Sequence, residues 1–228
     1  MTVSTTAQKL QICRIKFPEI KLQTRDAHKL RGYFGNLFKE HSPLLHNHYE
    51  DGSFRYKYPV IQYKVIDGTP MLVGIEAGAE LLTKLFLKIK ELDIDGTLYP
   101  VNSKNIESSR EETGYSEQLY SYTFKTLWMA LNQTNYPKYQ KMKDEQSRQE
   151  MLNSILVGHI LSFFRNSGIE LLPRERLMAR VEVKEGKTNF KEQKMIAFTG
   201  RFIVNARLPA GLGLGKAVSR GFGTIARE

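Results

Sequence analysis

Apolar residues in the first hundred positions change between the two-residue period of strands and the 3.6-residue period of helices. The elements that this pattern predicts are a strand at 10–16, a helix at 25–40, a hairpin at 58–75, a helix at 76–92 and a strand at 92–102. Asp67-Gly68 is the turn signal of the hairpin. The order strand, helix, strand, strand, helix, strand is that of a ferredoxin-like unit.

The second half of the chain repeats this order after a polar stretch at 103–114, SKNIESSREETG, which predicts a linker or exposed loop. The predicted elements are a strand at 118–131, a long helix at 143–168, and strands at 176–186 and 194–209. A glycine-rich segment follows where a second helix would be expected. We therefore predict an α+β protein of two tandem ferredoxin-like (βαββαβ) domains, at 1–102 and 115–228, the second with its last helix replaced by a glycine-rich loop. One continuous α+β domain is the alternative.

The charge of the 228-residue chain is strongly positive and unevenly placed. The formal net charge is +10, and residues 173–228 alone carry 12 Lys and Arg against 5 Asp and Glu. A basic region of this kind predicts an anionic partner such as nucleic acid. A solubilising cationic surface is the alternative interpretation.

Other bulk features restrict the class of protein. The single cysteine, Cys13, excludes an intrachain disulfide and a cysteine-rich zinc site, and its apolar neighbours predict a small buried hydrophobe. The N-terminus has no apolar signal core, and no stretch approaches the ~18 apolar residues of a membrane span. The sequence therefore predicts a soluble cytoplasmic protein with no membrane partner.

Five of the 17 glycines fall in the last eighteen residues, around GLGLGKAVSRGFG at 211–223. This segment matches neither the Walker loop nor the dinucleotide fingerprint, so neither ATP nor NAD is indicated as a cofactor. It does contain two Gly-hydrophobe-Gly units, whose glycines are Gly213, Gly215, Gly221 and Gly223. Such backbone can approach a phosphate closely, and Lys216 and Arg220, four residues apart, would share one side of a helical turn. The alternative is a glycine-rich turn packed under the sheet through Leu214 and Phe222.

Three of the five histidines fall within eight residues, in the segment HSPLLHNHYEDG. His46 and His48 are two apart, and on extended chain their side chains would point the same way, about 6.6 Å apart at roughly 3.3 Å per residue. One imidazole could take the proton of a ribose 2′-hydroxyl while the other protonates the departing 5′-oxygen, which is chemistry that needs no metal. Tyr49 and Tyr56 add stacking faces suited to RNA.

Other interpretations of the histidines stay open at this point. His46 and His48 with His41 or Glu50 could ligate zinc or nickel, as in a zinc-dependent hydrolase, but no further His or Cys cluster completes that site. Exposed loop histidines can also be purely structural. His159 lies beside the apolar stripe of the predicted long helix, which favours a satisfied core histidine.

Residues 31–82 resemble the N-terminal half of the CRISPR-associated repeat-cleaving endoribonucleases of the RAMP superfamily. The two glycine units at 213–223 match that family's glycine-rich signature without a gap, and LWMALNQTNYPKY at 127–139 also resembles its second half. The resemblance covers most of the chain, and its two ends agree on one family. Within it, the chain is most similar to a subgroup with a His-x-His pair.

The resemblance implies two tandem ferredoxin-like domains and a metal-independent endonuclease without a cofactor. Its substrate would be the CRISPR repeat RNA of a precursor transcript, and its products crRNAs with 5′-hydroxyl and 2′,3′-cyclic phosphate ends. His46 and His48 take the catalytic positions, and Tyr56 or Tyr49 the position of an assisting tyrosine. A non-catalytic RNA-binding subunit of a CRISPR effector complex is the competing hypothesis. A homodimer and effector-complex partners are both left open.

Overall fold

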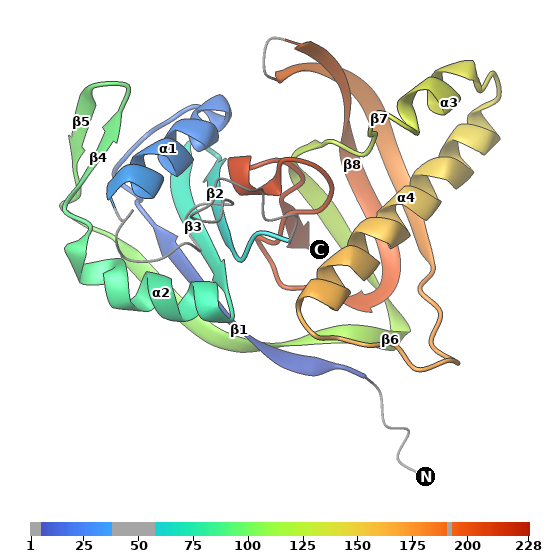
Figure 1. Cartoon of the computed structure of the whole chain (residues 1–228), viewed down its shortest axis with the longest axis horizontal. Helices are drawn as coiled ribbons and strands as arrows, with labels where there is room; N and C mark the ends of the chain where they lie inside the picture. The colour runs from blue at the N-terminus through green and yellow to red at the C-terminus, as the bar shows by residue number, and fades with distance from the viewer. Residues whose placement is uncertain (1–5, 38–57, 191–192) are drawn as a thin grey trace, which may run out of the picture. The chain divides into compact units, whose positions relative to one another are not determined.

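The structure, a computed structural model, describes residues 6–37, 58–190 and 193–228. The chain divides into two units that interleave in sequence (Figure 1). The N-terminal unit consists of Lys9–Glu111 together with Val218–Gly221, and the C-terminal unit of Met1–Gln8, Glu112–Ala217 and Phe222–Glu228. Each unit combines strands with helices, so the α+β class predicted from the sequence is confirmed.

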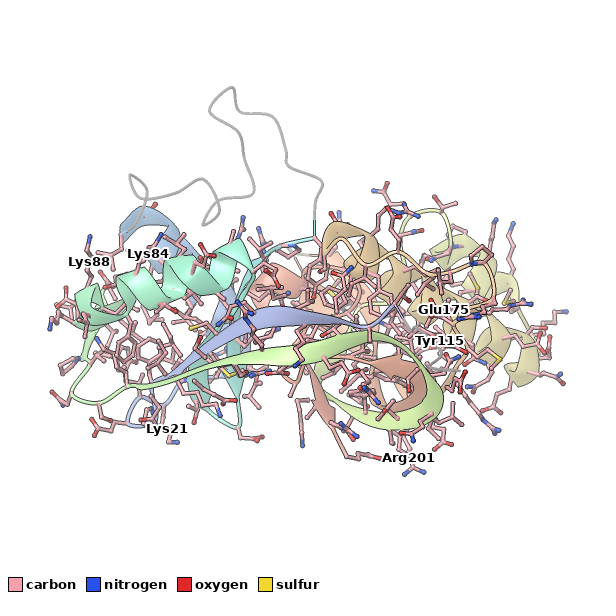
Figure 2. The ribbon with its side chains drawn as sticks, turned by 90° about the horizontal axis from the view of Figure 1, so that it is seen from below. Lys21, Lys84, Lys88, Tyr115, Glu175 and Arg201 are labelled. Atoms are coloured by element: carbon pink, nitrogen blue, oxygen red, sulfur yellow. The ribbon has the colours of Figure 1, made fainter. Side chains whose placement is uncertain are left out.

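The N-terminal unit is built on the strand order β2-β3-β1-β6. Its elements are β1 (Gln8–Lys16), η1 (Thr24–Asp26), α1 (Ala27–Leu37), β2 (Ile61–Ile66), β3 (Thr69–Ile75), α2 (Ala77–Leu85), η3 (Phe86–Lys88), β4 (Glu91–Ile94) and β5 (Thr97–Pro100). Lys84 on α2 and Lys88 on η3 are exposed and point away from the unit (Figure 2). Apolar residues of the sheet and both α-helices form one buried core.

The hairpin predicted at 58–75 is confirmed as β2 and β3. Ile66 pairs with Thr69 across the turn, and Asp67 and Gly68 both have positive φ, 49° and 77°. Two positive φ angles give the turn a twist that matches that of the strands it joins. Cys13 of β1 pairs with β3 and is fully buried, as predicted.

The predictions for residues 92–114 are wrong in two respects. Residues 92–102 do not add a strand to the main sheet, because β4 and β5 pair with each other as a separate two-stranded sheet. Residues 103–114 are not a linker, because β6 (Asn105–Trp128) begins at Asn105 and lies next to β1 in the strand order.

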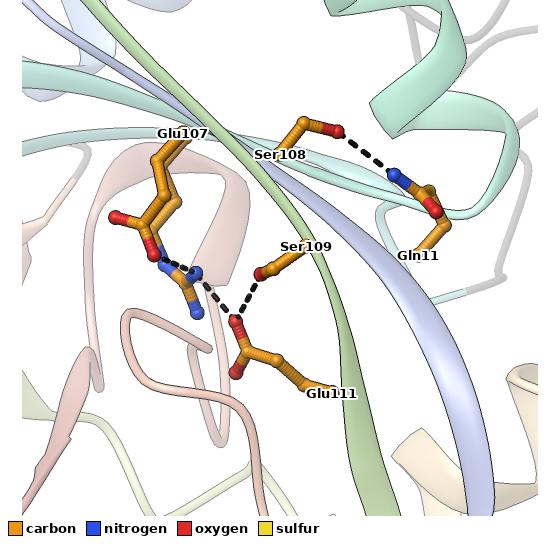
Figure 3. A network of polar contacts seen from close by, with 6 residues as sticks. Gln11, Glu107, Ser108, Ser109 and Glu111 are labelled. Atoms are coloured by element: carbon orange, nitrogen blue, oxygen red, sulfur yellow. Dashed lines mark hydrogen bonds and ion pairs between the residues drawn. The ribbon is translucent and has the colours of Figure 1, made fainter.

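Polar side chains suit this part of β6 because they bond to β1 (Figure 3). Arg14 of β1, only 6% exposed, forms ion pairs with Glu111 at 2.5 Å and with Glu107 at 3.3 Å. Ser109 donates a hydrogen bond to the Glu111 carboxylate, and the Gln11 amide donates one to Ser108. A buried arginine requires such partners, so the polar stretch at 105–111 belongs to a strand.

The C-terminal unit contains the strand order β9-β6-β8-β7. Its elements besides β6 are α3 (Tyr136–Lys141), α4 (Glu145–Asn166), β7 (Ala179–Phe190), β8 (Gln193–Arg207) and β9 (Ile225–Arg227), whereas the 3-10 helix η4 (Val218–Arg220) belongs to the N-terminal unit. The long helix predicted at 143–168 is confirmed as α4. Asp144 caps it by accepting a hydrogen bond from the Ser147 amide at 2.7 Å. No helix in the described ranges is long and apolar enough to cross a membrane.

His159 of α4 is a structural histidine, as the sequence predicts. The Trp128 indole donates a hydrogen bond to its Nδ1 at 3.3 Å, and the two rings meet edge to face. Burial lowers the pKa of His159 to about 4. The imidazole is therefore neutral in the folded protein at neutral pH.

This buried imidazole should make the protein less stable as the pH falls from about 6.5 to 4. In that window unfolded His159 binds a proton and folded His159 does not, so a falling pH favours unfolding. We expect a loss of roughly 2 kcal/mol in the free energy of unfolding from this residue, allowing for partial exposure of the ring. Urea unfolding across that window should show the loss in wild type and a flatter profile in His159→Gln. Equal slopes would contradict the assignment.

Candidate functional site

The glycine-rich segment forms a loop whose two ends are bonded to each other. Gly213 bridges to Thr224, and the Leu214 amide donates a hydrogen bond to the Gly223 carbonyl at 2.9 Å. Leu212 and Leu214 are fully buried. The segment is therefore a folded part of the protein whose leucines belong to the core.

Two of its glycines are required by close packing. A Cβ on Gly223, where φ is 63°, would lie 1.9 Å from the Leu214 carbonyl oxygen. A Cβ on Gly221, where φ is 90°, would lie 2.8 Å from the Ala27 Cβ and 3.2 Å from the Tyr63 carbonyl oxygen. No side chain fits at such distances without a shift of backbone. Packing thus accounts for these two glycines, which supports the alternative interpretation of the segment as a packed glycine-rich turn.

Several amides of the loop bond within the chain. The N–H groups of Lys216, Gly221 and Gly223 donate to the carbonyls of Met129, Val218 and Leu127, at 3.1, 3.2 and 2.8 Å. The amides of Gly211, Leu212 and Leu214 donate to other carbonyls in the same way, so six N–H groups of the segment at 211–223 are occupied. These amides are therefore not available to a phosphate.

The structure does not place Lys216 and Arg220 on one helical turn. Ala217 has a positive φ of 56°, so the backbone is not helical between Lys216 and the start of η4 at Val218. Lys216 belongs to the C-terminal unit and Arg220 to the N-terminal unit. The prediction of a shared turn is wrong, because four-residue spacing brings side chains together only on a continuous helix.

Arg220 is held beside α1 and β2. The helix η4 packs against both of these elements, and Val218 is buried there. Burial, with a smaller contribution from the positive charge of Arg31 on α1, lowers the pKa of Arg220. The glycine-rich segment therefore brings a guanidinium to the face of the N-terminal unit that carries Arg31.

The predicted catalytic residues His46, His48 and Tyr56 lie outside the described residues, as does Tyr49. The described chain on either side is α1, which ends at Leu37, and β2, which begins at Ile61. Within the described ranges, no three His, Cys, Asp or Glu side chains gather as a metal site.

Two family models match the chain in succession: the Cas6b N-terminal domain over residues 8–112 and the Cas6b C-terminal domain over residues 114–228. The chain belongs to the Cas6b family. This result confirms the resemblance to repeat-cleaving endoribonucleases that the glycine signature and residues 31–82 indicated.

Solved relatives agree with this membership. A crystal structure of Cas6b is 37% identical, with a TM-score of 0.91, over 97% of this chain and 100% of that one. A crystal structure described as a CRISPR RNA processing endoribonuclease Cas6b is 33% identical, with a TM-score of 0.78 over the same shares. An uncharacterized protein of Methanocaldococcus jannaschii is 37% identical over 145 residues, which are 63% of this chain and 97% of that protein.

Three further residues of this Cas6b-family chain lie near η4 and were missed by the sequence reasoning. They are Arg31 of α1 and Tyr63 and Lys64 of β2. Lys64 is fully buried, and burial lowers its pKa to about 7. The lysine inside the apolar strand sequence VIQYKVI could have indicated a buried amine. The position of Arg31 depends on the packing of α1 against η4, which no local pattern reveals.

Proposed function

We propose that this protein is a metal-independent endoribonuclease that cuts CRISPR repeat RNA within precursor transcripts. The products are crRNAs with 5′-hydroxyl and 2′,3′-cyclic phosphate ends. The observation that carries the proposal is the match of both Cas6b domain models along nearly the whole chain. A 33% identical relative described as a CRISPR RNA processing endoribonuclease adds support.

The proposed chemistry is a transesterification within the RNA. One of His46 and His48 takes the proton of the ribose 2′-hydroxyl, whose oxygen attacks the adjacent phosphorus. The other histidine donates a proton to the 5′-oxygen as the bond from phosphorus to that oxygen breaks. Tyr56 assists at the same phosphate. The atoms balance without water or a metal, and the cyclic phosphate is the direct product.

The proposed RNA contacts are made by the glycine-rich segment. Gly213, Gly215, Gly221 and Gly223 shape the loop, and Lys216 and Arg220 bind phosphates. The net charge of +7 over residues 173–228 supports an RNA contact in this part of the chain.

The proposed architecture is a tandem pair of ferredoxin-like domains, predicted at 1–102 and 115–228, with the first extended to Glu111 so that the start of β6 supplies its fourth strand. The orders β2-β3-β1-β6 and β9-β6-β8-β7 support it. In the N-terminal unit β1 lies between β3 and β6, and in the C-terminal unit β6 lies between β8 and β9. The first strand of each predicted βαββαβ pattern thus lies between its third and fourth strands. The glycine-rich segment stands between β8 and β9 of the second unit, where the pattern has its last helix.

Cleavage of an end-labelled repeat RNA in excess EDTA tests this function. We expect one cut that ends in a cyclic phosphate, and no cut when the nucleotide just upstream of that bond is 2′-deoxy, because the nucleophile is then absent. The 2′-deoxy RNA should still bind. Cleavage of the 2′-deoxy RNA, or loss of cleavage in EDTA, would contradict the mechanism. Tight binding without any cut would instead favour a non-catalytic RNA-binding subunit.

A further inference from the structure

Gly221 fixes the position of Arg220 on the N-terminal unit. Because a Cβ at Gly221 would meet the Ala27 Cβ at 2.8 Å and the Tyr63 carbonyl oxygen at 3.2 Å, the backbone there lies directly on α1 and β2. Arg31 is four residues after Ala27 on α1, so the two share one side of the helix. Arg220 is the residue before Gly221, and Arg31 lies one helical turn after Ala27. Both arginines therefore lie next to the contact between Gly221 and Ala27.

The charges at this place favour an anion. Arg31 is half-buried and, across the described part of the chain, forms no ion pair with an acidic side chain. The nearby acidic residue of η1, Asp26, pairs instead with Lys29 at 2.9 Å. Because η4, which carries Arg220, packs against α1, which carries Arg31, a negative charge bound between the two guanidinium groups would be stabilised by both.

A buried hydroxyl lies in the same region. Tyr63 is 1% exposed, and among the described side chains its Oη is a buried polar atom without a hydrogen-bond partner. Its ring is fixed by stacking on Phe34, with centroids 5.9 Å apart. Burial raises the pKa of Tyr63, so the hydroxyl keeps its proton and is a donor. A buried donor with no partner among the described residues is the kind of group that a bound ligand satisfies.

We propose that Arg31 and Arg220 together grip one phosphodiester group of the bound RNA backbone, at a site where α1, β2 and η4 meet. The inference rests on the proposed function and adds Arg31, a residue outside the glycine-rich segment and the histidine cluster. Guanidinium groups suit this role because each presents paired donors to phosphate oxygens. The site contacts backbone and not bases, so it adds affinity without selecting a sequence.

A double-mutant cycle with uncleavable 2′-deoxy repeat RNA tests the shared phosphate. We expect Arg31→Gln and Arg220→Gln each to weaken binding about tenfold. The double variant should bind little worse than either single one, because both arginines serve one phosphate. The salt dependence of RNA binding by the double variant should decrease by the slope expected for one phosphate contact, and not by the slope for two. Arg25→Gln, an exposed arginine of η1, is the matched control and should bind as wild type. Independent tenfold losses, or no loss in Arg31→Gln, would overturn the proposal.

A second measurement separates this site from the proposed function and from a structural role. Inorganic pyrophosphate should raise the melting temperature of wild type and of Arg25→Gln but not of Arg31→Gln, whether or not any RNA is cut. Without ligand, Arg31→Gln should melt no lower than wild type, since no described ion pair is lost. Absence of the pyrophosphate effect in wild type, or a lower melting temperature of unliganded Arg31→Gln, would overturn the site even if the protein cleaves repeat RNA.

Discussion

His46→Ala and His48→Ala are each expected to lower the rate of repeat RNA cleavage by about 10²–10⁴-fold, the usual contribution of a general acid or base. Binding of the uncleaved RNA should change little, because an imidazole that transfers a proton in the transition state adds little to ground-state affinity. Single-turnover cleavage and equilibrium binding, measured on the same RNA, separate the two effects.

The pH dependence of cleavage adds a second test of the same pair. One histidine must be neutral and the other protonated, so the wild-type rate should fall on both sides of neutrality. His28→Ala is a matched control, because His28 is an exposed histidine of α1 whose Nδ1 lies 2.6 Å from the Arg25 carbonyl oxygen. A rate that is flat with pH, or an equal loss in His28→Ala, would show that the roles are misassigned.

Local patterns predicted much of the fold because each one expresses a local physical requirement. The Asp67-Gly68 turn needs positive φ, and the apolar stripe of α4 must be buried. The polar start of β6 was mistaken for a linker because its side chains bond to Arg14, a partner more than 90 residues away in sequence. The sequence shows that residues 107 and 111 are glutamates, but it does not show that the buried Arg14 forms ion pairs with them.

The candidate site was predictable only in its parts. The two glycine units predicted backbone that approaches a phosphate, with a packed turn as the alternative. The contacts of Gly221 and Gly223 with protein atoms support the packed turn, and the approach to phosphate stays a prediction. The spacing of Lys216 and Arg220 predicted a shared helical turn, which Ala217 prevents by its left-handed conformation. The proximity of Arg31 to Arg220 follows from tertiary packing of residues 189 positions apart, so no window along the sequence contains it.

Gly223→Ala is expected to destabilise the protein by about 3 kcal/mol or more. A methyl group there would overlap the Leu214 carbonyl oxygen at 1.9 Å, and alanine disfavours the φ of 63°. The strain falls on the Leu214 amide to Gly223 carbonyl bond that closes the loop. A loss of this size should lower the melting temperature by roughly 6–12 °C in a chain of this length.

Gly158→Ala is the matched control. Gly158 lies inside α4, and a Cβ at that position would have no atom within 4 Å. Alanine should therefore raise stability by about 0.5–1 kcal/mol, because it restricts the unfolded chain and favours the helix. If Gly223→Ala melts like Gly158→Ala, the loop is not closed as described, and its glycines would have to be explained by RNA contact instead of packing. If it melts far lower, the proposed RNA binding by this segment would depend on a loop that the protein itself holds in shape.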